Sequence, residues 1–129
     1  MEAEAVEGPR EVLDDVSLVV TATTSREPVL PEQIPKGIFV AAVGSFEPEA
    51  AELPPALVSS SLVFVDTIEG AREEAGDLIR AQSAGAFGWE EATPLEEALR
   101  SPERPDTTVV FESVGHALWD LAAARTAYP

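Results

Sequence analysis

The 129 residues suit one compact domain, and 45% hydrophobic with 25% charged residues is typical of a globular chain. The net charge of −16 argues against nucleic-acid or membrane-surface partners, because an acidic surface repels phosphate groups. The absence of cysteine excludes disulfides and thiolate chemistry, and the single histidine, His116, excludes a His-rich metal site. The acidic start has no signal-peptide pattern and no apolar run reaches about 20 residues, so a cytoplasmic protein is predicted.

The first half of the chain predicts two strands between short helices. A short helix is expected over 11–15, after a proline suited to a first helical turn. Apolar runs rich in β-branched residues predict strands over 18–23 and 38–43. A weaker helix is expected over 48–59, where two consecutive prolines interrupt the pattern.

The second half continues the alternation of strands and helices. Strands are predicted over 62–65 and 108–111, and helices over 68–79, 94–100 and 115–127. Gly76 is expected to interrupt the first of these helices, with Asp77 capping the next turn. The spacing of Leu118, Leu121 and Ala122 predicts a buried face on the last helix.

These elements together predict an α/β fold in one domain spanning residues 1–129. The apolar runs are continuous rather than alternating, which is typical of parallel strands covered on both faces. We expect a three-layer, doubly wound, mostly parallel sheet with about four core strands and flanking helices.

Candidate ligand-binding residues lie where these strands end, because open parallel sheets bind ligands beyond the carboxyl ends of their strands. Hydroxyls and glycines gather at 21–25, 43–46 and 112–115, although serine and threonine at such positions often only cap the next element. Glu52, Asp66 and Asp77 are candidate carboxylates, but in so acidic a chain we expect solvated or capping roles. His116 could titrate near neutral pH, but is expected to be an ordinary helix-start residue. No glycine-rich phosphate loop or nucleophile motif occurs.

The segment 19–28, VVTATTSREP, resembles the strand-and-loop motif of the ornithine cyclodeaminase/mu-crystallin family. Further motifs follow in order over about residues 12–127: Lys36-Gly37, Ala42-Val-Gly44, Glu52-Leu53, Val65-Asp66, Glu74-Ala-Gly-Asp-Leu78, Phe111-Glu-Ser-Val-Gly115 and Asp120-Leu-Ala-Ala-Ala124. Members of this family are NAD(P)-dependent, and include ornithine cyclodeaminase, reductases of cyclic imino acids, an alanine dehydrogenase and the thyroid-hormone-binding crystallin. The resemblance implies that the chain is the carboxyl-terminal part of an NAD(P)-binding Rossmann domain.

The resemblance also implies a cofactor site without an assigned catalytic residue or metal. Thr23 and Thr24 are expected near the nicotinamide half of NAD(P), and Val43 and Ser113 near its ring and ribose. Phe46 stands where the cyclodeaminase has its catalytic aspartate, so reduction of an imino acid such as Δ1-pyrroline-2-carboxylate is favoured over an ornithine cyclodeaminase fragment.

Glu112 is a second departure, because many relatives carry lysine there. The reversed charge weakens the expectation of a contact with an anionic ligand at this position.

A complete relative would carry a substrate and dimerisation region and a first Rossmann half before the part seen here. The chain is therefore expected to be truncated, to bind NAD(P) weakly or not at all, and to be inactive alone. Residues 18–23 would be a central strand with an exposed edge, which predicts a homo-oligomer or a separate amino-terminal half as partner. Residues 1–10, with Glu4-Ala-Val6, are expected to be disordered or re-paired. A non-catalytic interaction module, or a longer enzyme with a misassigned start, are the alternatives.

Overall fold

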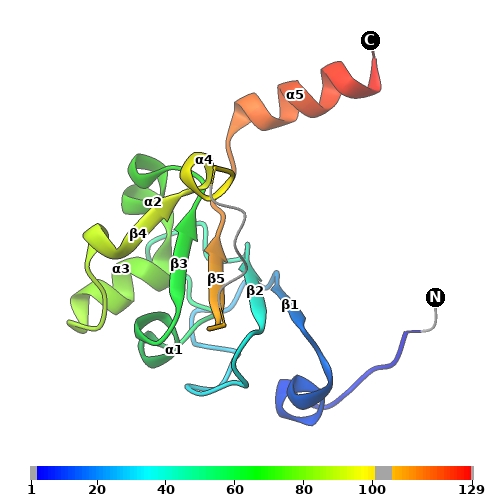
Figure 1. The fold of residues 1–129 in the computed structure, drawn as a ribbon, viewed down its shortest axis with the longest axis vertical. Helices are drawn as coiled ribbons and strands as arrows, with labels where there is room; N and C mark the ends of the chain where they lie inside the picture. The colour runs from blue at the N-terminus through cyan, green and yellow to red at the C-terminus, as the bar shows by residue number, and fades with distance from the viewer. Residues whose placement is uncertain (1–2, 101–105, 129) are drawn as a thin grey trace.

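The computed structural model describes residues 3–100 and 106–128. Five parallel strands form one sheet in the order β1-β2-β5-β3-β4 (Figure 1). Their bounds are β1 Leu18–Thr21, β2 Phe39–Ala42, β3 Leu62–Val65, β4 Ala92–Pro94 and β5 Val109–Glu112. The predicted α/β fold with a partial Rossmann-like parallel sheet and flanking helices is confirmed.

The strand β4 was not predicted from the sequence. It pairs with β3 through Val63↔Ala92, Phe64↔Thr93 and Val65↔Pro94, at the edge of the sheet opposite β1. Three residues ending in proline show no apolar run, and proline is tolerated here because an edge strand leaves some N–H positions unpaired. The sheet therefore has one strand more than the sequence indicated.

The helices are short and follow the predicted order. They are α1 Pro55–Ser59, α2 Ile68–Glu74, α3 Gly76–Ser83, α4 Leu95–Ala98 and α5 Ala117–Ala127, with 3₁₀ turns at Pro9–Glu11, Leu13–Asp15 and Trp89–Glu91. The predicted break near Gly76 is confirmed, since Ala75 separates α2 from α3. Of the expected helix over 48–59 only the last turn forms. Pro55 suits the first position of a helix, and the residue before it, Pro54, is extended, so the helix begins at Pro55.

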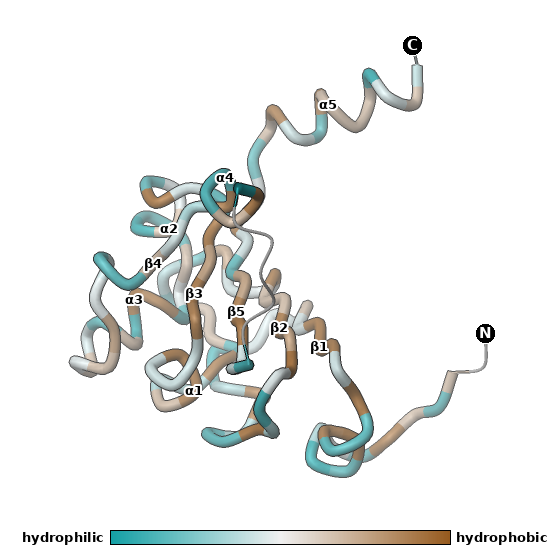
Figure 2. The backbone as a smooth tube through the Cα atoms, in the orientation of Figure 1, coloured by the Kyte–Doolittle hydropathy of each residue, from teal (hydrophilic) through white to brown (hydrophobic). Residues whose placement is uncertain are grey.

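The two faces of the sheet differ in burial. One face packs against α1, α2 and α3 and forms the core, in which Val40, Val65 and Val110 are fully buried. The other face exposes a set of apolar side chains: Leu18, Val20, Phe39 and Leu62. We call these four residues the open face. In Figure 2 the backbone of β1, β2, β3 and β5 is mostly brown, the colour of hydrophobic residues.

The prediction that α5 has a buried face is wrong. No residue of this helix is buried, and Leu118 and Leu121 are 63% and 55% exposed. The helix extends away from the sheet (Figure 1), so its apolar spacing has no packing surface within the described residues. His116 is confirmed as a helix-start residue, because its Nδ1 accepts a hydrogen bond from the backbone N–H of Leu118 at 3.1 Å.

Two further observations concern regions away from the sheet. Residues 3–8 form neither helix nor strand, and disorder or re-pairing of the first ten residues stays a prediction. Within 3–100 and 106–128, no helix is long and apolar enough to cross a membrane.

Candidate functional site

The four predicted cofactor residues lie at one edge of the sheet. Because β1, β2 and β5 are adjacent and in register, with Thr21 beside Ala42 and Ala42 beside Glu112, the loops that follow them start side by side. Thr23 and Thr24 lie in the first of these loops, Val43 in the second and Ser113 in the third. The first three side chains are exposed and Ser113 is half-buried. Their contact with a cofactor stays a prediction.

Glu52 holds the loops after β1 and β2 together. Its side chain is fully buried, and its Oε1 and Oε2 accept hydrogen bonds from the backbone N–H groups of Thr23 at 2.5 Å and Gly44 at 2.9 Å. A Cβ on Gly44 would lie 2.5 Å from Glu52 Cδ, so only glycine fits this close approach. The expectation of a solvated or capping carboxylate is therefore wrong for Glu52, which organises the site from inside.

Asp77 supports Glu52 from the start of α3. Its Oδ1 accepts hydrogen bonds from the backbone N–H groups of Glu52 and Leu53, at 2.7 and 2.8 Å. Burial raises the pKa of Asp77 above its ordinary value, and these two backbone donors lower it in part. The predicted role of capping the following turn is wrong, since Asp77 accepts its bonds from a segment 24 and 25 residues away.

Asp66 connects the end of β3 to the loop after β5. Its Oδ2 accepts hydrogen bonds from the Ser113 hydroxyl at 2.9 Å and from the backbone N–H of Gly115 at 2.8 Å. Gly115 has a φ of 82°, a left-handed conformation that favours glycine. The Ser113 proton is thus committed to Asp66, which leaves the lone pairs of its oxygen to accept from a ligand donor.

Glu112 ends β5 beneath the same edge and is 1% exposed. Its Oε1 shares a hydrogen bond with the Ser45 hydroxyl, which follows β2. Burial raises the pKa of Glu112 well above its ordinary value, and the nearby charge of Asp77 raises it further. Sequence reasoning noted this position only for its charge. An acidic residue that directly ends an apolar strand was the available signal.

A small hollow opens beside the predicted cofactor residues. Its volume is about 200 Å³, and its lining includes Thr24, Arg26, Gly44 and Phe46. Arg26 is the cation of this lining. Pockets for whole cofactors or drug-sized ligands usually measure about 300–1,000 Å³, so the hollow matches only part of a dinucleotide site. Within the described part of the chain, no cluster of three or more potential ligands could hold a metal ion.

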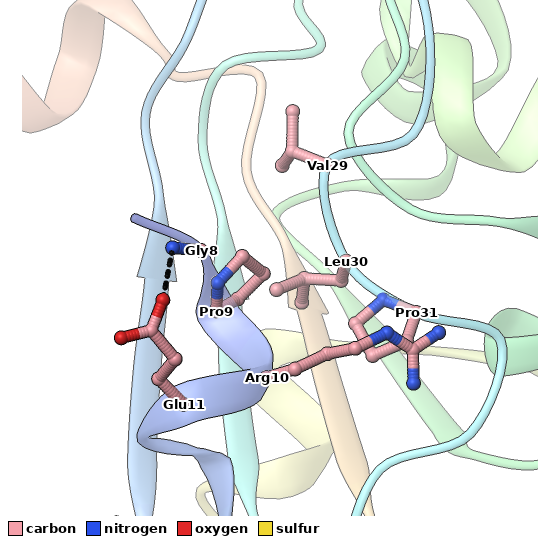
Figure 3. Close-up of a pocket in the computed structure, with 7 residues that line it drawn as sticks. All are labelled: Gly8, Pro9, Arg10, Glu11, Val29, Leu30 and Pro31. Carbon is pink, nitrogen blue, oxygen red and sulfur yellow. Dashed lines mark hydrogen bonds between the residues drawn. The ribbon is translucent and has the colours of Figure 1, made fainter. Parts of the chain in front are cut away.

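A second hollow lies near the segments that flank β1, away from these residues. Figure 3 shows it between Gly8–Glu11 and Val29–Pro31, with the Gly8 N–H donating to Glu11 Oε1 at 3.1 Å. Its volume is about 290 Å³, and none of the predicted cofactor residues lines it. We assign it no part in the site.

Comparison with known proteins gives a consistent family signal. The model of the ornithine cyclodeaminase/mu-crystallin family matches residues 1–129. The Δ1-pyrroline-2-carboxylate reductase 2 of Burkholderia ambifaria is 44% identical over 114 residues, covering 88% of this chain and 35% of the reductase.

Solved structures agree with this signal. The Δ1-pyrroline-2-carboxylate reductase of Thermococcus litoralis, in complex with NADH and L-proline, has a TM-score of 0.86 at 32% identity, over 95% of this chain and 40% of that one. The iminosuccinate reductase of Paracoccus denitrificans, in complex with NAD+, has a TM-score of 0.79 at 28% identity, over 95% of this chain and 38% of the reductase. The chain thus spans between a third and two fifths of the length of these relatives.

Proposed function

This chain belongs to the ornithine cyclodeaminase/mu-crystallin family, and we propose that it supplies the nicotinamide-side wall of an NAD(P)H-dependent reductase site for a cyclic imino acid such as Δ1-pyrroline-2-carboxylate. One observation carries the proposal: the loops after β1, β2 and β5, which hold the four predicted cofactor residues, start side by side. The relatives named above include imino-acid reductases, one of them bound to NADH and L-proline.

The side chains at this edge suit a nicotinamide and its ribose. Val43 offers an exposed apolar surface against which an aromatic ring can pack. Ser113, oriented by Asp66, offers an acceptor to a ribose hydroxyl or a carboxamide N–H. Thr23 and Thr24 follow β1, so the loop that carries Val43 lies between them and the loop that carries Ser113. The cofactor itself supplies the hydride, and the chain positions the ring.

Phe46 favours imino-acid reduction over ornithine deamination. Its ring is 49% exposed and lines the hollow beside Gly44. An apolar ring neither accepts nor donates a proton, so it cannot replace a catalytic aspartate. Hydride transfer from the cofactor to the carbon of an imine does not require a base at this position.

We further propose that the 129 residues alone bind NAD(P) weakly and do not turn over substrate. The sequence contains no glycine-rich turn that would present backbone N–H groups to a pyrophosphate. Arg26 is the cation lining the 200 Å³ hollow, and a net charge of −16 opposes the approach of phosphate groups. Unless the cofactor and the substrate are both bound in the reactive geometry, hydride transfer between them is not accelerated by positioning.

A chimera tests the wall separately from the rest of the site. The matching segment of the Burkholderia ambifaria reductase is replaced by this chain, and reduction of Δ1-pyrroline-2-carboxylate is assayed with NADPH and NADH. Activity within about tenfold of the parent, and at least tenfold weaker cofactor binding after Ser113→Ala, would support the proposal. A folded chimera that binds no dinucleotide would refute it. Calorimetric titration of the isolated chain completes the test, since tight binding there would refute the expected weakness.

A non-catalytic, self-associating module is the second candidate. The edge of β1 pairs with no other strand in the described residues, and Leu18 and Val20 are 57% and 59% exposed on the open face. Exposed apolar edge strands recruit other chains. A second copy, or a separate amino-terminal half, would cover this edge. A concentration-independent monomer in light scattering would exclude the homo-oligomer.

A further inference from the structure

Four carboxylates are buried together at the carboxyl edge of the sheet. Glu52, Asp66, Asp77 and Glu112 are 0%, 6%, 0% and 1% exposed. In the described ranges, the one ion pair joins Arg80 to Glu27 at the surface, 3.2 Å apart, so no arginine or lysine there neutralises this group. Buried like charges without a cation repel each other strongly, and at least one of the four is expected to hold a proton.

The hydrogen-bond partners distinguish the four carboxyl groups. Glu52 and Asp77 each accept from two backbone N–H groups, and Asp66 accepts from one backbone N–H and one hydroxyl. Such donors stabilise a negative charge. Among the described residues, no backbone N–H donates to Glu112, and its one hydrogen-bond partner, the Ser45 hydroxyl, can equally well accept a hydrogen bond. Glu112 is therefore the group that loses least by being neutral.

Unpaired oxygens around Ser45 point the same way. Asp77 Oδ2 and Glu112 Oε2 are both buried and have no hydrogen-bond partner within residues 3–100 and 106–128. The Ser45 hydroxyl partly offsets the rise that burial causes in the pKa of Asp77. If Ser45 accepts from Glu112, the oxygen left unpaired on Glu112 is uncharged. A neutral unpaired oxygen costs much less than a charged one.

We propose that Glu112 is a buried neutral carboxylic acid that donates its proton to Ser45 Oγ, so that it acts as a positioning residue which joins the ends of β2 and β5. Ser45 lies two residues after Val43, and Glu112 directly precedes Ser113. The same junction thus fixes two of the predicted cofactor positions. The protonation of Glu112 does not depend on the proposed function, because it follows from contacts within the chain.

The junction makes folding stability sensitive to rising pH. The titratable groups that face Glu112 are Asp77 of α3, Glu52 before α1 and Asp66 after β3, all acidic. Burial raises the pKa of Glu112, so above the ordinary pKa of glutamate the folded chain holds a proton that the unfolded chain has released. The contribution of Glu112 to the unfolding free energy is therefore fully present below the ordinary pKa of glutamate and falls as pH rises toward the raised pKa.

The experiment compares unfolding of the wild-type chain and Glu112→Gln in urea from pH 5 to pH 9. Glutamine keeps an N–H donor for Ser45 and has no proton to lose. We expect the unfolding equilibrium constant of the wild type to rise relative to Glu112→Gln by up to about tenfold per pH unit. Glu73→Gln, an exposed glutamate on α2, is the matched control and should follow the wild type. Parallel pH dependence of the wild type and Glu112→Gln would overturn the proposal.

Infrared spectroscopy of the wild type keeps the test independent of any variant's folding. At pH 6 exposed carboxyl groups are ionised, since their pKa values lie near 4. A carbonyl stretch of a protonated carboxylic acid that persists at this pH supports the proposal, and disappearance of this band in folded Glu112→Gln assigns it. Absence of the band in the wild type at pH 6 would refute a neutral Glu112.

Discussion

Replacing Glu52 with glutamine measures how strongly one buried carboxylate organises the candidate site. The wild-type side chain accepts from the backbone N–H groups of Thr23 and Gly44, at 2.5 and 2.9 Å. Glutamine keeps one acceptor oxygen, and its NH₂ group faces the second N–H donor. One backbone donor is then buried without a partner, which costs about 1–3 kcal/mol.

Removing the charge has an opposing effect of smaller size. The charge of Glu52 repels that of Asp77, and neutralising Glu52 relieves this repulsion. Effective dielectric constants near 20 reduce such terms in folded proteins, so we expect the lost hydrogen bond to dominate. The net loss in unfolding free energy should be about 1–2 kcal/mol. The unfolding free energy of a domain of this size is about 5–15 kcal/mol, so the variant should still fold.

Urea denaturation followed by fluorescence measures this loss, because Trp89 is buried and reports on the core. The slope of free energy against urea should stay unchanged, which identifies a change in stability rather than in compactness. Glu49→Gln, an exposed neighbour, should change stability by less than about 0.5 kcal/mol. If Glu52→Gln is as neutral as this control, the reasoning about the buried carboxylate is refuted.

Three further substitutions test other parts of the structure. Gly44→Ala should destabilise the chain by about 3 kcal/mol or more, because its Cβ would displace the Glu52 carboxyl group, and the melting temperature should fall accordingly. Val20→Lys on the open face should reduce self-association in light scattering, whereas Val20→Thr, which keeps the shape, should reduce it less; equal effects would argue against this surface. Leu121→Ser on α5 should change the unfolding free energy by less than about 0.5 kcal/mol, and a larger loss would show that this helix packs in solution.

Local patterns in the sequence were sufficient for the order and type of most elements. Continuous apolar runs identified β1, β2, β3 and β5, because these strands carry apolar residues on the core face and on the opposite face alike. The break between α2 and α3 was visible as a glycine in an amphipathic segment. The edge strand β4 left no such pattern, since three residues at the border of the sheet need little burial.

The candidate site was predictable in its position and not in its construction. The rule that loops follow the carboxyl ends of parallel strands placed Thr23, Val43 and Ser113 together. The carboxylates that hold those loops could not be identified, because 24 acidic residues give no local sign of which few are buried. Burial is a property of the folded chain, decided by which segments close over a side chain.

The sequence by itself determined the order of β1, β2, β3 and β5 along the chain, the acidic composition and the position of the loops that hold the candidate site, because these depend on neighbours close in the chain. Tertiary structure alone decided that Glu52, Asp77 and Glu112 lie inside and that α5 lies outside. The physical reason is that hydrogen bonds between residues 24 to 67 positions apart, such as those of Asp77 and Ser45, depend on the packed sheet and have no local sequence signal.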